Sequence, residues 1–382
     1  MHSDCTEKRM FFDKATINGM TVQNRLVRSA TWEGLASSEG FVTPALETAM
    51  LDLVSGGVGM IITGHAFVAE QGRAGERQLG IHTDKHISGL RSMVGKVHDA
   101  GGVIVAQLAH AGGQAAQAIS GLPAAGPSPF TRRDGEVCKQ MTEEDIDNMV
   151  YAFQQAAARA VATGFDGVQI HGAHGYGISQ FLSPHLNKRS DAYGGTFENR
   201  IRVLVRVYEA VRRVVGDSYP VLLKINCEDY IEGGLTVEDS VNAVERLASV
   251  GLDAVEISGG LLTNSPSTSS VRVGNFDTPA KEVWYRDAAR RVKERTKLPV
   301  MLVGGVRSFS VAEGVLHDGV ADFIAMSRPL LREPALARRW AAGDLRRAAC
   351  ISCNKCFSVL YNNEGYFCPV AHDEAIAVGV SA

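Results

Sequence analysis

The amino-acid sequence predicts an α/β protein built as a TIM (β/α)8 barrel. Short apolar segments rich in β-branched residues alternate with helical patterns along most of the 382 residues. Nearly continuous apolar strands that alternate with helices indicate a parallel sheet covered on both faces. A doubly wound open sheet is the alternative, but no glycine-rich dinucleotide fingerprint follows the first strand, so the barrel is favoured.

Eight strands are predicted, and several follow the same lead-in. A glycine ends a helix and an acidic residue then precedes the strand, as in Gly164-Phe165-Asp166 and Gly251-Leu252-Asp253. The predicted strands are Leu26–Ala30, Met60–Thr63, Val103–Gln107, Gly167–His171, Val221–Asn226, Ala254–Ser258, Val300–Val303 and Asp322–Met326.

The remaining elements are predicted from turn and capping signals. The segment Ala15–Val22 contains an Asn-Gly turn and is expected to form a hairpin that caps the N-terminal mouth of the barrel. A helix is expected to begin after Thr142, which is its N-cap, and to run to about Ala162. The long loops Ala111–Cys138 and Gly259–Pro279 follow strands, so both are expected on the active face as lids or as disordered segments.

Composition excludes several classes of function. The net charge is −3 and no block of basic residues occurs, so a nucleic-acid partner is not expected. No apolar run is long enough to span a bilayer, and residues 1–9 lack the apolar core of a signal peptide. A cytoplasmic protein without a membrane partner is expected.

A single barrel domain with a C-terminal tail is expected. Residues 1–335 form the barrel, and residues 336–382 form a C-terminal helix and a cysteine-rich tail packed on it. The tail holds four of the seven cysteines, and clustered cysteines in a cytoplasmic protein favour a metal or cluster site over disulfides. They are Cys350, Cys353, Cys356 and Cys368.

The segment His171-Gly172-Ala173-His174-Gly175-Tyr176 places two imidazoles and a phenol just past the end of the fourth predicted strand. In a parallel barrel, catalytic groups collect at that end of the strands. Two histidines can donate hydrogen bonds to one carbonyl oxygen, and a tyrosine can deliver a proton nearby. The pair could also be core histidines or metal ligands, although no carboxylate lies close by as a third ligand.

The residues that follow this segment make the functional interpretation more specific. They read Arg189-Ser190-Asp191-Ala192-Tyr193-Gly194-Gly195, followed by Glu198-Asn199-Arg200. Together with the histidine segment, they resemble the signature of the Old Yellow Enzyme family of FMN-dependent oxidoreductases, over roughly residues 10–335. The resemblance implies that His171 and His174 hold a substrate carbonyl oxygen over the flavin and that Tyr176 donates a proton. Arg189 and Asp191 are expected to fix the loop that presents the pair.

The same resemblance implies a flavin site at the strand ends. Gln107 matches the amide partner of the pyrimidine edge, and Lys224 matches the cation beside flavin N1. The expected phosphate-binding residues follow strands seven and eight, where TIM barrels often bind phosphate. They are Gly304, Gly305, Ser327 and Arg328. The residues expected to pack on the flavin ring are Ala30, Thr31 and Gly64.

Three positions depart from the family pattern. Lys224 stands where arginine is usual, which keeps the charge but loses bidentate geometry. Ser327 stands where glycine is usual, and Trp32 occupies a position often held by threonine or cysteine. These changes bear on the flavin potential and on the shape of the pocket.

The cysteine tail resembles the iron–sulfur branch of the family, which includes 2,4-dienoyl-CoA reductase and trimethylamine dehydrogenase. Its spacing is C-x2-C-x2-C-x11-C, one residue shorter than the C-x2-C-x3-C-x11-C of that branch. The further flavin domain of the larger enzymes does not follow before Ala382, so a cluster would have no electron source within this chain. A 4Fe–4S cluster, a structural zinc and four free thiols all remain open.

The sequence therefore predicts an ene-reductase. NAD(P)H is expected to reduce FMN, which passes hydride to the β-carbon of an enone or enal while Tyr176 protonates the α-carbon. Three alternatives stay open: an oxidative demethylase or flavin reductase on the same fold, a flavin-free barrel enzyme that uses Lys224 as a Schiff base or general base, and an iron–sulfur electron-transfer or sensor protein. A homo-oligomer is expected by resemblance only.

Overall fold

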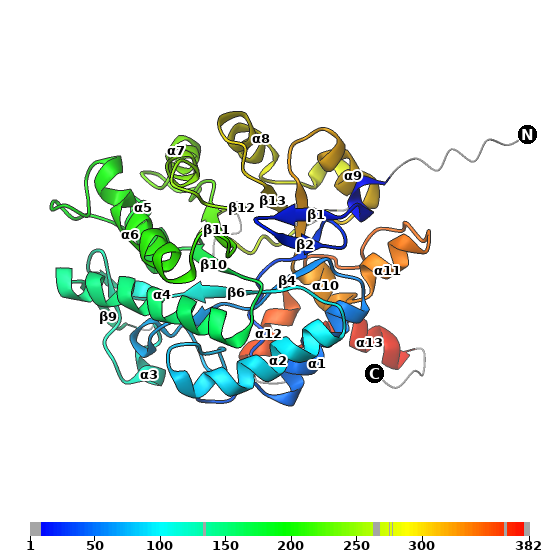
Figure 1. The fold of residues 1–382 in the computed structure, drawn as a ribbon, viewed down its shortest axis with the longest axis horizontal. Coiled ribbons are helices and arrows are strands. Elements are labelled where there is room, and N and C mark those ends of the chain that lie inside the picture. The colour runs from blue at the N-terminus through cyan, green and yellow to red at the C-terminus, as the bar shows by residue number, and fades with distance from the viewer. Residues whose placement is uncertain are drawn as a thin grey trace, which may run out of the picture.

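The computed structural model describes residues 9–132, 135–262, 268–274, 276, 278–362 and 365–377. Parallel strands close into a barrel, because β14 pairs with β3 and β6 pairs with both β4 and β10. The barrel strands are β3 (Leu26–Arg28), β4 (Met60–Ile62), β6 (Ile104–Ala109), β10 (Gly167–Gly172), β11 (Val221–Asn226), β12 (Ala254–Ser258), β13 (Val300–Val303) and β14 (Phe323–Met326). The predicted TIM barrel is confirmed (Figure 1).

All eight predicted strands are present; ten of their sixteen ends agree with the prediction, and the other six differ by one or two residues. The first strand stops at Arg28 because its ladder with β14 ends at the pair Met326–Arg28. The chain beyond it leaves the barrel wall and reaches the cavity described below. A further short strand, β5 (Ala66–Phe67), pairs with β6 and was not predicted.

Helices surround the strands (Figure 1). Apolar residues of these helices and of the strands share one buried core cluster. The longer helices are α1 (Pro44–Ser55), α2 (Ile87–Asp99), α4 (Glu143–Thr163), α6 (Phe197–Val215), α7 (Val237–Ala248), α8 (Arg286–Arg295) and α9 (Phe309–His317). Shorter ones are α5 (Gly177–Leu182), α10 (Arg328–Arg332) and α11 (Leu336–Ala341). Single 3-10 turns are η1 (Met10–Phe12), η2 (Glu70–Gly72), η3 (Asp84–His86), η4 (Gly112–Gln114) and η5 (Pro279–Lys281).

Helix α4 begins where the capping signal predicted. The Thr142 hydroxyl accepts a hydrogen bond from the Asp145 amide at 3.1 Å, and the Asp145 carboxylate accepts one from the Thr142 amide at 2.8 Å. This reciprocal pair satisfies two amide donors that a helix start leaves free. The helix ends at Thr163, and its C-cap Gly164 has a φ of 89°, the left-handed conformation that glycine adopts without steric penalty.

The predicted hairpin is formed by β1 (Ala15–Ile17) and β2 (Met20–Val22). Asn18 and Gly19 both have positive φ, as a tight turn between twisted strands requires. Its apolar side chains share one buried cluster with residues of the barrel interior such as Val27 and Met301. The hairpin therefore closes the barrel mouth, as expected (Figure 1).

The described part of the loop Ala111–Cys138 contains more secondary structure than the sequence indicated. Besides η4 it contains α3 (Gln117–Ser120) and the strands β7 (Ala125–Gly126), β8 (Phe130–Thr131) and β9 (Val137–Gln140), which form a small sheet. These strands were missed because two to four residues are too few for periodicity to show. The second loop, Gly259–Pro279, falls partly outside the described residues, as do residues 1–8 at the N-terminus.

The C-terminal tail lies against the barrel. It contains α12 (Lys355–Tyr361) and α13 (Pro369–Ala377). The Tyr366 hydroxyl accepts a hydrogen bond from the buried Arg28 at 3.2 Å, and the Arg307 guanidinium donates to the Ser352 hydroxyl at 2.7 Å. These contacts tie the tail to β3 and to the segment after β13. The division at residue 335 stays a prediction.

No described helix combines the length and the apolar character that crossing a bilayer would require.

Candidate active site

A cavity opens at the carboxyl ends of the barrel strands and collects nearly every residue predicted for the site. The predicted residues that line it are Ala30, Thr31, Gln107, His171, His174, Tyr176, Lys224, Gly304, Gly305, Ser327 and Arg328. Gly64 is not part of this lining. Its amide donates to Glu33 at 2.9 Å, and a Cβ at Gly64 would lie 2.1 Å from the Glu33 carboxylate. Gly64 therefore permits close packing behind the cavity.

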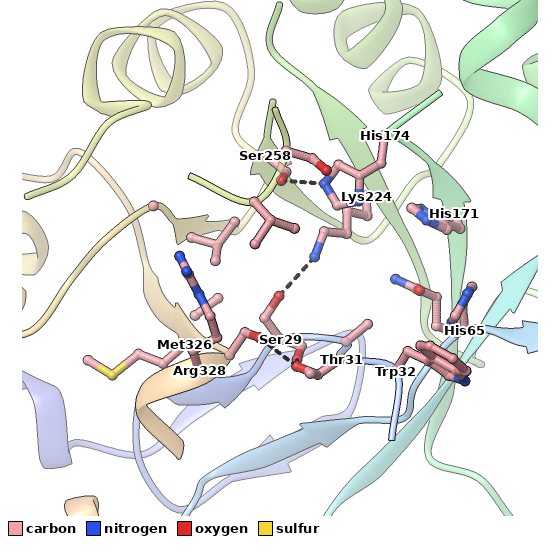
Figure 2. Close-up of a pocket in the computed structure, with 18 of the residues that line it drawn as sticks. Ser29, Thr31, Trp32, His65, His171, His174, Lys224, Ser258, Met326 and Arg328 are labelled. Atoms are coloured by element: carbon pink, nitrogen blue, oxygen red, sulfur yellow. Dashed lines mark hydrogen bonds between the residues drawn. The ribbon is translucent and has the colours of Figure 1, made fainter. Parts of the chain in front are cut away.

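The histidine pair and the tyrosine all line the cavity, as predicted. Figure 2 shows the two histidines beside the end of β10. The ring of His171 lies 5.3 Å from that of His174 and 5.3 Å from that of Tyr176, centroid to centroid. His174 has a φ of 65°, and its amide donates to the Asn226 side chain at 3.0 Å. Its Nε2 lies 2.7 Å from the Ser258 hydroxyl. Side chains of β11 and β12 thus orient a residue that follows β10.

Burial keeps all three groups uncharged. Desolvation, followed by the positive charge of Lys224, holds the pKa of His174 well below the usual range. Desolvation, followed by the neighbouring His174, lowers the pKa of His171 as well, and the His171 Nδ1 is buried with no hydrogen-bond partner among the described residues. Desolvation raises the pKa of Tyr176, so its phenol keeps its proton. Neutral imidazoles and a protonated phenol are suited to hydrogen bonding and proton donation.

The loop signature has the structural role that its sequence indicated. Arg189 is buried, and its guanidinium donates to the Asp191 carboxylate at 2.5 Å and to the Met141 carbonyl at 2.6 Å. The same carboxylate accepts from the Tyr193 amide at 3.0 Å. None of the three lines the cavity. The cluster ties the segment after α5 to the end of the β7–β9 sheet.

His65 is a cavity residue that the sequence analysis missed. Its ring stacks on Tyr176, with centroids 5.5 Å apart and planes inclined by 8°, and its Nε2 lies 3.4 Å from the Tyr176 hydroxyl. Burial lowers the pKa of His65 to about 4, so this ring is neutral as well. His65 follows the carboxyl end of β4, and His171 lies at the carboxyl end of β10. Catalytic groups collect at these strand ends in parallel barrels, so the argument that identified the histidine pair applies equally to His65.

We expect these buried histidines to make the protein less stable as the pH falls from 7 to 5. An unfolded histidine has a pKa of about 6.5 and takes up a proton in this range. Folded His65 and His110 do not, because burial lowers the pKa of each to about 4. The unfolded state therefore binds more protons, and each residue should remove roughly 2 kcal/mol by pH 5. Urea unfolding at pH 7, 6 and 5 measures the slope.

Two variants check the assignment. His110→Gln should reduce the slope of unfolding free energy against pH, because unfolding would then take up as much as one proton less. His317→Gln should leave it unchanged, because the His317 side chain is 82% exposed. Equal slopes for His110→Gln and the native chain would contradict the prediction.

The far end of the cavity suits a phosphate. Gly304 and Gly305 have positive φ, and a Cβ at Gly305 would lie 2.5 Å from the Trp284 ring. Arg328 donates through Nη2 to the Arg272 carbonyl at 2.9 Å, while its Nη1 is buried with no partner in the described chain. A buried guanidinium N–H without an acceptor is costly unless an anion binds it. The residues present therefore fit the phosphate group of FMN.

Replacing Arg328 by methionine should weaken FMN binding about 10- to 100-fold. A charge-assisted hydrogen bond contributes about 1.5–3 kcal/mol, and 1.4 kcal/mol corresponds to a factor of ten. Fluorescence titration of the apoprotein with FMN measures the change. Arg332→Met is the matched control, because Arg332 lies on the same helix and contacts Glu374 and Cys368, outside the cavity. Equal losses in both variants would indicate damage to α10 rather than a phosphate contact.

The tail supplies a wall that was not predicted. Phe357 and Tyr361 of α12 line the cavity, and the Tyr361 ring lies 5.3 Å from that of Trp32. Trp284 and Tyr285 line it from the segment before α8. These aromatic residues carry no local pattern that separates them from core residues, so only their position in the fold identifies them.

The metal site expected at the four tail cysteines is not confirmed by the described part of the chain. No group of three or more cysteine, histidine or acidic side chains among the described residues is arranged to hold a metal ion. The Sγ atoms of Cys350 and Cys368 lie 3.9 Å from Arg307 Nη2 and 3.7 Å from Arg332 Nη1. The predicted cluster or zinc site is therefore not confirmed and stays a prediction.

Residues 10–345 match the NADH:flavin oxidoreductase / NADH oxidase family. This chain belongs to that family. It is 37% identical over 326 residues to an NADPH dehydrogenase of Geobacillus sp. (strain WCH70), an alignment that covers 85% of this chain and 92% of the relative. It is 32% identical over 349 residues to an NADH oxidase of Thermoanaerobacter brockii, which covers 90% of this chain and 52% of the relative. The chain thus spans about half the length of the latter protein.

The fold agrees with this family assignment. The structure of an old yellow enzyme homologue from Zymomonas mobilis superposes with a TM-score of 0.75 at 26% identity, covering 90% of this chain and 95% of that one. The resemblance to the Old Yellow Enzyme family is therefore confirmed. Family membership supports FMN as cofactor and NAD(P)H as reductant, and it argues against the flavin-free alternative.

Proposed function

We propose that this protein reduces the activated carbon–carbon double bond of α,β-unsaturated carbonyl compounds with electrons from NAD(P)H. The observation that carries the proposal is the neutral pair His171 and His174 beside the protonated Tyr176, in the same cavity as the flavin-binding set. When bound, FMN supplies the redox chemistry, namely hydride taken from NAD(P)H and delivered to the β-carbon of the substrate.

The histidine pair would bind the substrate carbonyl oxygen. Each neutral imidazole has one N–H to donate, and negative charge develops on that oxygen as hydride arrives at the β-carbon. The two rings lie only three residues apart in the sequence, with centroids 5.3 Å apart, so both donors can point toward a single oxygen. Polarisation of the carbonyl makes the β-carbon a better hydride acceptor.

Tyr176 would deliver the proton that completes the reduction. The α-carbon becomes basic when the β-carbon has received hydride, and the buried phenol lies beside His171 in the same cavity. Its raised pKa keeps the proton in place until that point. Product leaves as the saturated carbonyl compound, and the phenol regains a proton from solvent.

The remaining predicted residues would hold the cofactor. Arg328 and the glycine pair Gly304-Gly305 would bind its phosphate, and Gln107 and Lys224 would meet the polar edge of its ring. Ala30 and Thr31 would pack on the ring. The cavity thereby brings hydride donor and acceptor into contact, which can supply a large part of the rate.

The test is an anaerobic assay with FMN-loaded protein, NADPH or NADH, and cyclohex-2-enone. The expected result is cyclohexanone in a 1:1 ratio to oxidised nicotinamide, with deuterium at the α-carbon when the solvent is D2O. Flavin that is reduced by NAD(P)H but not reoxidised by the enone would overturn the proposal and favour a flavin reductase. Release of formaldehyde from a methylamine with an added electron acceptor would instead favour the demethylase.

A further inference from the structure

A row of buried polar side chains lies directly behind the cavity and joins four barrel strands. Gln107 of β6 donates through Nε2 to the Gln169 carbonyl of β10 at 2.7 Å. Gln169 donates through Nε2 to Glu256 of β12 at 3.0 Å. The other oxygen of Glu256 accepts from Lys224 Nζ of β11 at 3.0 Å and from the Ser29 hydroxyl at 2.5 Å.

Glu256 does not touch the cavity, whereas the residues at the two ends of the row do. Glu256 and Gln169 are fully buried and neither lines the cavity, while Gln107, Lys224 and Ser29 all do. Figure 2 shows Lys224 reaching toward Ser29 across the cavity floor. Glu256 therefore makes no direct contact with a molecule bound in the cavity, and its hydrogen bonds reach that molecule only through its neighbours.

The carboxylate fixes the direction of every hydrogen bond in the row. An ionised carboxylate can only accept, so Gln169 must turn its NH2 group toward Glu256. The Gln169 carbonyl must then accept, which takes the NH2 group of Gln107. The carbonyl oxygen of Gln107 is left as the group that can meet a ligand. A neutral side chain at position 256 would not impose this order.

The carboxylate also offsets the positive charge of Lys224. The Lys224 side chain is 4% exposed and that of Glu256 is fully buried, so solvent screens this ion pair little. A reduced flavin gathers negative charge at its N1–C2=O edge, where a lone cation would stabilise it. A lysine paired with a buried carboxylate stabilises that charge less.

We propose that Glu256 is a positioning residue that governs the flavin through two neighbours. It directs the carbonyl of Gln107 toward the ring N3–H of the flavin, and it lowers the reduction potential by offsetting Lys224. The inference rests on the proposed function, because it requires a flavin in this cavity. Glu256, a residue outside the cavity, would therefore make the site prefer the N3–H donor of the flavin, and it would also set the reduction potential of the flavin.

Two variants separate the two effects. Glu256→Gln removes the charge, and we expect the midpoint potential of the FMN-loaded protein to rise by at least 30 mV, the equivalent of a tenfold shift in a two-electron equilibrium. Gln169→Met breaks the row but keeps the ion pair of Lys224 with Glu256. Its potential should stay near the native value, while its preference for FMN over 3-methyl-FMN, which lacks the N3–H, should fall at least tenfold.

A pair of further variants covers the case in which Glu256→Gln does not fold. Lys224→Met leaves the buried carboxylate unpaired and should lower the potential, and adding Glu256→Gln to it should restore the potential toward the native value. Equal potentials in that single and double variant, or unchanged selectivity in Gln169→Met, would overturn the corresponding half of the proposal. If the native chain binds no FMN, both the proposed function and the role of Glu256 are overturned. If the native chain binds FMN but the variants have the native midpoint potential, only the role of Glu256 is overturned.

Discussion

Replacing Tyr176 by phenylalanine is expected to slow the oxidation of the reduced enzyme by an enone about 10²- to 10⁴-fold, the range that a positioned general acid contributes. Phenylalanine keeps the stacking on His65 and removes only the hydroxyl, so the cavity should retain its shape. Reduction by NADPH requires no proton from this position and should be unchanged. Stopped-flow absorbance of the flavin resolves the two half-reactions separately.

Tyr193→Phe is the matched control for this change. The Tyr193 hydroxyl accepts a hydrogen bond from Arg206 at 2.7 Å and the residue does not line the cavity, so both half-reactions should proceed at native rates. Two results for Tyr176→Phe would contradict the assignment. An unchanged enone reaction would mean that the proton comes from elsewhere, and an equal loss in both half-reactions would mean that the cavity had been disturbed.

Removing the donor at His174 is expected to lower the rate of enone reduction about 10²- to 10³-fold, because one donor to a developing oxyanion commonly contributes that much. The backbone limits the choice of substitutions, since φ is 65° at this position. Asparagine adopts the left-handed conformation more readily than most residues and carries an N–H donor. His174→Asn should therefore keep most of the activity, while His174→Leu should lose it.

The contrast between these two variants tests the role of the donor. FMN affinity should be the same in both, because the predicted phosphate-binding and ring-edge residues lie on other strands. Steady-state rates with cyclohex-2-enone, together with the Kd for FMN, provide the measurement. Loss of activity in both variants would indicate that the imidazole does more than donate a hydrogen bond, and retention in both would remove His174 from the mechanism.

Local sequence patterns determined the barrel and much of the site. The repeated glycine and acidic lead-ins mark where helices end and strands begin, and the Thr142 cap marks where α4 begins, because both signals act within a few residues. The position of His171 in the last residues of a strand, and of His174 just beyond it, was equally readable. In a parallel barrel all such ends meet at one face, so linear order alone placed these side chains together.

The tertiary structure decided what depends on contacts between distant segments. The partnership of Lys224 with Glu256 depends on the register of β11 with β12, in which the two residues are neighbours. The aromatic wall formed by Phe357 and Tyr361 depends on where the tail packs against the barrel. Hydrophobic periodicity reports which face of an element is buried. It does not report which buried polar groups meet, because each such meeting is fixed by strand register and by the packing of the whole chain.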